Sequence, residues 1–411
     1  MPSAPAAAPL WRNADYMLLW GGQVVSTLGS TASAVIYPLL ILALTGSPEA
    51  AGIAGALRAV PYLVLSLPVG ALIDRWDRKA VMILCDVGRA VAVATIPLAM
   101  ALDRLTLAQV YVVTLVEGSL FVFFNIAEVA ALPRVVPAGQ LPQAAAQNEA
   151  GFGAAHIAGP MFGTILYQSF GRGVPFLADA ATYAVSVLSL LRIRTAFSAE
   201  RAPVERDLRR EVAEGLRWLW ANPLIRYMAF LTGAINLVNA GVPLTLIVLA
   251  KATGATDAQV GAIFGISGIG GIVGSLIGGQ IQKRFRFGQV IAVLVWVEAL
   301  LFPLYAIMPS YVLLGAIGAL HFLLSPIYNV VQFSYRLALI PDRLQGRVNS
   351  VFRLIAFGFM PIGAALAGVL LERFGATATV AIFSAWLLML AVLTALNRHV
   401  RDAAPIGRAM A

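Results

Sequence analysis

Long apolar segments alternate with short polar ones along the whole chain. A helix needs about 20 apolar residues to cross the hydrocarbon core of a bilayer, and segments of this length recur to the C-terminus. Proline and glycine inside them are tolerated in membrane helices. The pattern predicts an all-α polytopic membrane protein with twelve spans, at 16–44, 49–73, 78–102, 106–132, 143–169, 175–192, 225–249, 257–282, 287–308, 311–335, 346–372 and 377–397.

The composition agrees with a membrane protein and excludes several other classes. Hydrophobic residues make up 60% of the 411 residues and charged residues only 12%, unlike a soluble domain. The net charge of +9 is spread over the loops, so we expect no nucleic-acid partner. With one cysteine and three histidines, the chain offers no intrachain disulfide, and we expect neither a metal site nor a cofactor.

The distribution of Lys and Arg predicts the orientation of the spans. If the N-terminus is cytoplasmic, 22 of the 29 basic residues fall in inner segments and four in outer loops. Cytoplasmic loops of membrane proteins carry this excess. We therefore expect a multi-pass protein of the cell inner membrane with both termini cytoplasmic.

The longest polar stretch, from Arg192 to Pro223, separates six spans from six. Within it, residues 205–220 have leucine and valine at helical spacing beside several arginines, which predicts an amphipathic helix on the inner leaflet. A plain solvated linker is the alternative. The expected organisation is an N-terminal tail, a six-helix bundle, a cytoplasmic linker with the amphipathic helix, a second bundle and a C-terminal tail, at 1–15, 16–192, 193–224, 225–397 and 398–411.

The two sets of six spans repeat one another. Phe124-Asn125 returns as Tyr328-Asn329 at an offset of 204 residues, and Asn148 returns as Asn349 at an offset of 201. Small differences between offsets are expected where loops differ in length. Because an even number of helices separates equivalent points, the copies have the same orientation and are related by an axis along the membrane normal.

A highly charged stretch lies between spans 2 and 3. Five charges fall within 74–79, and because they cannot remain in hydrocarbon, they predict a tight aqueous turn. Its order, Gly-x-x-x-Asp-Arg-x-x-Arg-Lys, resembles the signature loop of the major facilitator superfamily, with Asp77 in place of a usual glycine. The resemblance implies the twelve-helix major facilitator fold and a gating role for Gly70, Asp74, Arg75, Arg78 and Lys79.

Within this turn, we expect Gly70 to let two helices approach closely. The resemblance implies that Asp74 and Arg78 lock the inner ends of the two halves when the cavity faces outward. The degenerate second copy, Gly278-x-x-x-Gln282-x-x-x-Arg286, has lost the acid.

Other runs narrow the resemblance to one branch of the superfamily. Residues 19–26, 214–219 and 338–349 are similar to the branch of macrolide-efflux and enterobactin-exporter proteins. Span 5 carries Gly159, Pro160 and Gly163, similar to the antiporter motif, although its first and last glycines are replaced. The resemblance implies export of an amphipathic drug, macrolide or siderophore-like molecule by alternating access, with proton antiport as the expected coupling. The arginine that drug antiporters carry in span 4 is absent.

Charged residues inside the spans are candidates for that coupling. A charge at a helix centre costs about 2.5–3.5 kcal/mol on insertion scales, so each needs a partner or a function. Arg58 and Glu117 lie at similar depth, roughly 15 Å from the outer helix ends, so we expect them to pair. The pair is either a static structural contact or one that a proton or a cationic cargo opens. Asp86 and Arg89 suit an intrahelical pair, and Glu298 a buried pairing role.

Three more titratable residues lie within or near the middle of spans. His321 is the repeat equivalent of Glu117, Glu128 is the equivalent of Gln332, and His156 lies in span 5. A histidine can titrate near neutral pH, so these residues join the pair above as candidates for proton coupling. Hydrogen-bonded packing is the alternative for each histidine.

Polar and aromatic residues on the expected cavity helices are candidates for substrate binding. Apolar walls with a few hydrogen-bonding groups bind drug-sized molecules with little selectivity. Helix–helix contact is the alternative role for each. The candidates are Gln23, Ser26, Phe121, Phe124, Asn125, Asn236, Asn239, Tyr328 and Asn329.

Other functional classes fit less well. The chain has no phosphate-binding Gly-x-x-x-x-Gly-Lys-Ser/Thr loop, as an ATP-driven pump would need, and no cluster of nucleophile and base, as an enzyme would need. A two-half repeat argues against a channel. An importer of a small nutrient and a non-transporting scaffold or sensor remain alternatives. We expect a monomer whose partners are the bilayer, a small-molecule substrate and protons.

Overall fold

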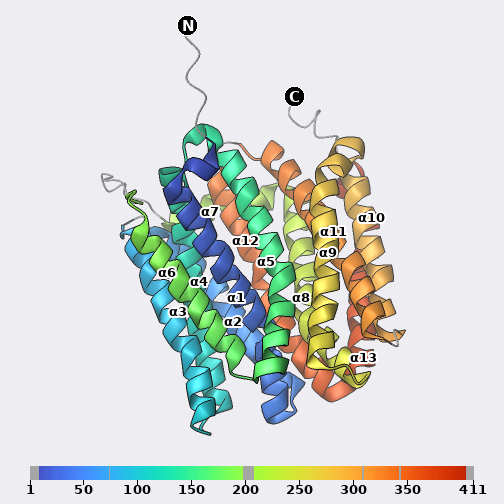
Figure 1. The fold of residues 1–411 in the computed structure, drawn as a ribbon. Helices are drawn as coiled ribbons and strands as arrows, with labels where there is room; N and C mark the ends of the chain where they lie inside the picture. Colours follow the sequence, from blue (N-terminus) through green and yellow to red (C-terminus); the bar gives the residue numbers. More distant parts are fainter. Residues whose placement is uncertain (1–8, 74, 198–207, 308–309, 342–343, 404–411) are drawn as a thin grey trace.

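The computed structural model describes residues 9–73, 75–197, 208–307, 310–341 and 344–403. Within these ranges every regular element is helical (Figure 1). The elements are η1 (Leu10–Arg12), α1 (Ala14–Thr45), α2 (Pro48–Ile73), α3 (Arg78–Ala101), α4 (Leu107–Val135), η2 (Ala138–Gln140), α5 (Leu141–Phe170), α6 (Val174–Arg192), α7 (Leu208–Ala221), α8 (Pro223–Ala252), α9 (Asp257–Arg284), α10 (Phe287–Leu301), η3 (Phe302–Ile307), α11 (Tyr311–Leu339), α12 (Gln345–Gly358), α13 (Met360–Leu396) and α14 (Arg398–Arg401).

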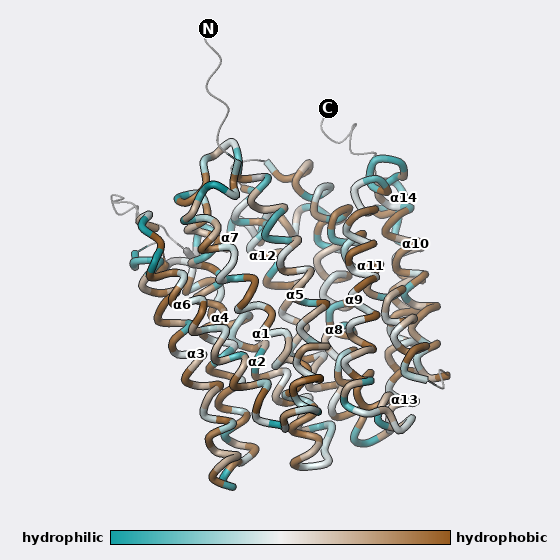
Figure 2. The backbone as a smooth tube through the Cα atoms, viewed as in Figure 1, coloured by the Kyte–Doolittle hydropathy of each residue, from teal (hydrophilic) through white to brown (hydrophobic). Residues whose placement is uncertain are grey.

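These helices confirm the prediction of twelve spans. Ten described stretches are long and apolar enough to cross a membrane. One of them, Gln345–Leu396, contains two spans, because Gly375 has a φ of 77° and breaks α13. The twelfth span is α5, a helix of 30 residues that is less apolar than these ten stretches. Figure 2 shows hydrophobic residues along the helices and hydrophilic ones concentrated toward their ends. The protein is a multi-pass membrane protein.

Side-chain caps begin several of these helices. Asp77 precedes α3, and its carboxylate accepts a hydrogen bond from the backbone N–H of Ala80 at 2.7 Å. A glycine at position 77 has no side chain to make this bond. At the start of α9, Thr256 and Gln259 form a reciprocal capping box. Local sequence therefore determines where these two spans start.

Helices of the first six spans pack mainly on one another, and so do those of the last six. In the first set α1 packs against α5 and α6, α2 against α4, and α3 against α4 and α6. In the second, α9 packs against α11 and α8 against α13. The most extensive contacts between the sets are those of α2 with α13 and of α5 with α9. The first set lies to the left in Figure 1 and the second to the right.

Glycines allow the two sets to meet closely near one end of the bundle. We call it the distal end: it carries the turn between α1 and α2, whereas η1 and α14 lie at the proximal end (Figure 1). A Cβ added to Gly52 of α2 would lie 2.7 Å from the Cα of Gly368 in α13. A Cβ added to Gly261 of α9 would lie 1.7 Å from Oγ1 of Thr164 in α5. Side chains at these positions would push the two sets apart.

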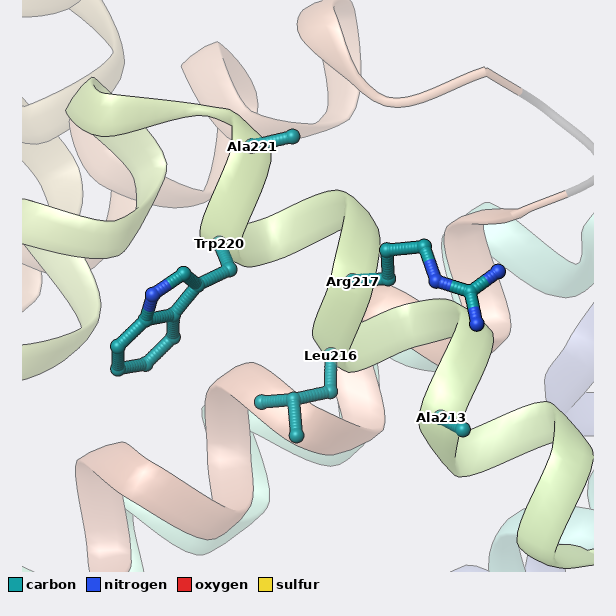
Figure 3. A pocket seen from close by; sticks show the side chains of 5 residues that line it. All are labelled: Ala213, Leu216, Arg217, Trp220 and Ala221. Atoms are coloured by element: carbon teal, nitrogen blue, oxygen red, sulfur yellow. The ribbon is translucent and has the colours of Figure 1, made fainter.

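The linker helix α7 packs against α12 and α8, on the C-terminal set. Glu211 and Glu214 both pair with Arg347 of α12, the first at 3.4 Å. Leu216 and Trp220 are exposed. With Ala213, Arg217 and Ala221 they line a surface pocket, and Figure 3 shows Leu216 and Trp220 on one side of the helix and Arg217 on another. The helix predicted for this stretch forms over its described residues; residues 205–207 lie outside the described ranges.

Candidate functional site

A buried ion pair lies at the centre of the N-terminal set. Nη2 of Arg58, on α2, donates to Oε1 of Glu117, on α4, at 2.6 Å. The Glu117 side chain is 1% exposed and that of Arg58 is 28% exposed. Helix packing enforces the contact, because a Cβ on the neighbouring Gly118 would lie 2.2 Å from the Arg58 carbonyl oxygen. The pairing predicted from the depth of these residues is confirmed.

Two buried tyrosines complete the surroundings of Glu117. The hydroxyl of Tyr37, on α1, donates to Oε2 at 2.9 Å, and that of Tyr183, on α6, donates to Oε1 at 3.4 Å. Both tyrosines are buried. Together with the Arg58 guanidinium, these donors contact both carboxyl oxygens of Glu117.

A second guanidinium extends the cluster onto α3. Arg89 Nη2 donates to the Tyr183 hydroxyl at 2.6 Å and to Ser30 Oγ at 3.2 Å. Arg89 Nη1 lies 3.5 Å from Oδ1 of Asp86, and both side chains are buried. The predicted intrahelical pair is therefore confirmed, and Tyr183 connects it to Glu117.

One acidic member of this cluster, Asp179 of α6, was not predicted from the sequence. Its side chain is fully buried, and Oδ2 lies 2.5 Å from Oγ of Ser33 on α1. Its Oδ1 is buried and has no hydrogen-bond partner in the described part of the chain. The signal was available: an acidic residue inside an apolar helix of 19 residues is as unusual as Arg58 or Glu117.

A smaller polar cluster occupies the C-terminal set. His321 Nε2, on α11, lies 3.0 Å from Oδ1 of Asn239 on α8 and 3.8 Å from Oε1 of Glu298 on α10. Phe302 and Tyr305 of η3 pack their rings about 6 Å from the imidazole. Glu298 is buried as predicted, and its contact with His321 is an ion pair only when the imidazole is protonated.

The two clusters occupy equivalent places in the repeat, but acidic and basic residue types are exchanged between them. Glu117 lies ten residues after the start of α4, and His321 ten residues after the start of α11. Arg89 and Glu298 each lie eleven residues after the start of α3 and α10. An acid in the N-terminal set, Glu117, thus corresponds to a base, His321, and the base Arg89 corresponds to the acid Glu298.

The remaining proton-coupling candidates lie apart from these contacts. Glu128 is buried and has no ion pair among the described residues. Its repeat equivalent, Gln332, is also buried, and its Nε2 has no hydrogen-bond partner among those residues. His156, on α5, has an exposed side chain.

The substrate-binding candidates differ widely in their surroundings. Gln23, Ser26, Phe124 and Tyr328 are buried, and the Tyr328 hydroxyl lies 2.8 Å from Thr232 Oγ1. Other candidates are less buried. Asn125 is half-buried, Asn236 donates to the Ala356 carbonyl at 2.8 Å, Phe121 lies 5.7 Å from the Arg89 guanidinium, and Asn329 is exposed.

The charged turn makes its described contacts within the N-terminal set. Arg78 donates to the carbonyl of Ala130 at 2.8 Å, and Lys79 to that of Ile193 at 2.7 Å. The expectation of a close helix approach at Gly70 is wrong, because a Cβ added there would meet no atom within 4 Å. Arg75 is exposed, and Asp74 lies outside the described residues.

The glycines of span 5 pack α5 on α1. A Cβ on Gly159 would lie 2.0 Å from Thr31 Oγ1, and a Cβ on Gly163 would lie 2.7 Å from the Ala32 carbonyl. Pro160 is buried between them. This stretch therefore brings α5 into close contact with its own set, while Thr164 faces α9.

A polar contact joins the two sets nearer the proximal end. Arg353 of α12 donates to the hydroxyl of Tyr62 on α2, and its guanidinium lies 5.9 Å from the rings of both Tyr62 and Phe357. The two rings pack edge to face at 5.9 Å. The sequence pattern did not predict this contact.

Comparison with known proteins identifies the family of this chain. Residues 19–331, well over half of the chain, match the family model described as Major Facilitator Superfamily. The chain belongs to the Major Facilitator Superfamily. Two curated relatives of this superfamily align along almost its full length. They are the multidrug efflux pump Tap of Mycolicibacterium fortuitum, 28% identical over 94% of this chain and 96% of the relative, and the enterobactin exporter EntS of Escherichia coli strain K12, 27% identical over 90% and 89%.

Solved structures show the same major facilitator fold. The nucleoside transporter NupG superposes with a TM-score of 0.75 at 14% identity and covers 93% of this chain and 98% of its own. A bacterial homologue of the iron transporter ferroportin gives a TM-score of 0.74 at 14% identity, over 94% and 99%. At these identities the likeness concerns the fold alone, and the predicted twelve-helix architecture is confirmed.

Proposed function

We propose that this protein exports amphipathic small molecules across the cell inner membrane by proton antiport. The observation that carries the proposal is the buried cluster of Arg58, Glu117, Arg89, Asp86 and Asp179. Ionisable groups inside a membrane domain are costly, and a network of them across four helices suits a proton-linked switch. Relatives described as an efflux pump and an exporter support the outward direction.

The alternating-access part of the proposal rests on where the two sets meet. The contacts of Gly52 and Gly261 close the distal end, and Gln168 of α5 also accepts from the backbone N–H of Ala258 there at 3.1 Å. With both termini cytoplasmic, the proximal end faces the cytoplasm, and this arrangement corresponds to an inward-facing state. Movement of 16–192 against 225–397 would open the distal end and close the proximal one.

The linker and the charged turn have supporting roles in this cycle. The exposed Leu216 and Trp220 of α7 suit contact with the inner leaflet, beside Arg217. Arg78 and Lys79 hold α3 to its own set in this state. Asp74 would engage the other set when the proximal end closes.

The substrate we propose is a drug-, macrolide- or siderophore-like molecule. The candidates with side chains that are not buried, Phe121, Asn125, Asn236 and Asn329, offer aromatic surface and amide groups with little charge. Such a surface binds through apolar area and a few hydrogen bonds. His156 on α5 and the His321 cluster would add further titratable groups.

Transport by the purified protein in proteoliposomes under an imposed pH gradient tests the proposal. The panel contains a hydrophobic cation, a macrolide and a catecholate siderophore, with empty liposomes as the control. We expect pH-driven movement of at least one compound, opposite to the flow of protons and abolished by an uncoupler. Movement in the same direction as protons would favour the importer, and no movement of any compound would favour the scaffold or sensor.

A further inference from the structure

Asp179 is the acidic member of the N-terminal cluster that has no cation. The cluster contains three buried carboxyl groups, those of Asp86, Glu117 and Asp179, and two guanidinium groups, those of Arg58 and Arg89. With every group ionised, the cluster has a net charge of −1. Because an uncompensated charge is very costly in a buried site, one proton on one of the three acids would stabilise the cluster.

Two of the three acids lie next to a guanidinium group, although Oδ2 of Asp86, like Oδ1 of Asp179, has no hydrogen-bond partner among the described residues. Glu117 accepts from Arg58 at 2.6 Å and from two tyrosine hydroxyls, and Asp86 lies 3.5 Å from Arg89. In the described part of the chain, no Lys, Arg or His lies within ion-pair distance of Asp179. Its carboxyl group is therefore the one for which ionisation is least compensated.

The hydrogen bonds around Ser33 agree with a neutral Asp179. The single hydroxyl hydrogen of Ser33 has two oxygen atoms within reach, Oδ2 of Asp179 at 2.5 Å and the carbonyl of Ser30 at 3.2 Å. A hydroxyl donates only one hydrogen bond. If Asp179 carries a proton on Oδ2, it donates to Ser33 Oγ, and Ser33 donates to the Ser30 carbonyl. Each oxygen pair then has a hydrogen between its two atoms.

We propose that Asp179 carries the exchangeable proton of the antiport in this conformation, with Glu117 remaining ionised against Arg58. This inference rests on the proposed function and names the residue through which it works. The neighbouring groups come from every element around α6. They are Ser33 and Tyr37 from α1, Arg58 from α2, Asp86 and Arg89 from α3, Glu117 from α4 and Tyr183 from α6 itself. The titratable residues of α5 are Glu149, His156 and Tyr167. None of these three α5 residues is within hydrogen-bonding distance of Asp179 in the described chain.

Release of the proton requires a cation to come closer to Asp179. Arg89 is suitably placed, because it is bound to Tyr183, one turn along the same helix, at 2.6 Å. A shift of α3 against α6 would bring its guanidinium toward Asp179 and away from Tyr183, while Asp86 moves with it on the same helix. The proton would then leave the carboxyl group for water, and the net charge of −1 left on the cluster would require water or a cationic substrate beside it.

Infrared spectroscopy of the purified full-length protein tests the protonation directly. A neutral carboxyl group has a C=O stretching band distinct from that of a carboxylate. We expect this band to be lost in Asp179→Asn, shifted in Ser33→Ala, and unchanged in Asp103→Asn, which removes an exposed acid. A wild-type-minus-Asp179→Asn spectrum without a protonated-carboxyl band would overturn the assignment. If Asp179→Asn does not fold, an unshifted band in Ser33→Ala overturns it instead.

Transport measurements separate this inference from the proposed function. In proteoliposomes, Asp179→Asn should lose the response of transport to an imposed pH gradient. Retention of that response would overturn the coupling role, even if the infrared band is lost. If the wild-type protein itself shows no pH-driven transport, the proposed antiport fails, whereas the infrared result still decides whether Asp179 is protonated.

Discussion

Breaking the Arg58–Glu117 pair should destabilise the protein by an amount that depends on which residue is removed. Arg58→Ala leaves Glu117, which is 1% exposed, without its guanidinium. Removing one partner of a buried pair typically costs about 3–5 kcal/mol. Glu117→Ala leaves Arg58, whose side chain is 28% exposed and keeps part of its hydration, so we expect the lower end of that range. The Tyr37 hydroxyl also loses its acceptor, which costs about 1–3 kcal/mol.

The pH dependence of Arg58→Ala provides a second check. Glu117 can escape the penalty by taking up a proton, and protonating an ordinary glutamate at pH 7 costs about 3.7 kcal/mol, from its reference pKa near 4.3. The destabilisation in Arg58→Ala is therefore limited to roughly this amount. It should shrink as the pH falls from 7 to 5, by up to about 1.4 kcal/mol per unit. Thermal or denaturant unfolding in detergent micelles would measure both effects.

An exposed ion pair of the same length serves as the control. Lys251 Nζ lies 2.6 Å from Asp257 Oδ1, but these side chains are 41% and 28% exposed. Lys251→Ala should therefore cost no more than about 1 kcal/mol, with little change between pH 7 and 5. In the double variant of Arg58 and Glu117, stability should partly recover. Loss equal to the sum of the single variants, within about 0.5 kcal/mol, would refute the argument that the two charges compensate each other.

Three further predictions concern contacts between the two sets. Gly52→Leu should separate α2 from α13 at the distal end and lower transport. Gly279→Leu should do neither, because a Cβ at Gly279 meets no atom within 4 Å. Spin-label distances across the distal end would show the difference. Arg353→Gln should weaken the contact with the α2 tyrosine and broaden the distances between α2 and α12, and an unchanged distribution would show that the contact is incidental. Asp74→Asn should lower transport without loss of folding, and Gln282→Ala should be nearly silent, as transport assays with matched expression would reveal.

The sequence by itself determined the spans and the family. Hydrocarbon accepts only long apolar helices, so the positions of the twelve spans follow from local composition, and Asp77 shows how one side chain determines where a span begins. The depth of Arg58 and Glu117 in neighbouring helices was enough to predict their pairing, because an unpaired charge at that depth is costly. The turn Gly70–Lys79 and the repeat of the two halves pointed to the superfamily that the comparison then showed.

Only the tertiary structure decided the other partners in the cluster. Tyr37 and Tyr183 reach Glu117 from helices 80 and 66 residues away, and Ser33 meets Asp179 across 146 residues. These contacts depend on how each helix is rotated about its axis, which side-chain packing sets and hydropathy does not reveal. For the same reason, a Cβ at Gly70 would meet no atom within 4 Å, whereas Gly118 and Gly52, in apolar runs without a recognisable motif, proved to be points of close helix approach. Sequence identified which residues were costly to bury, and packing decided which of them lie against one another.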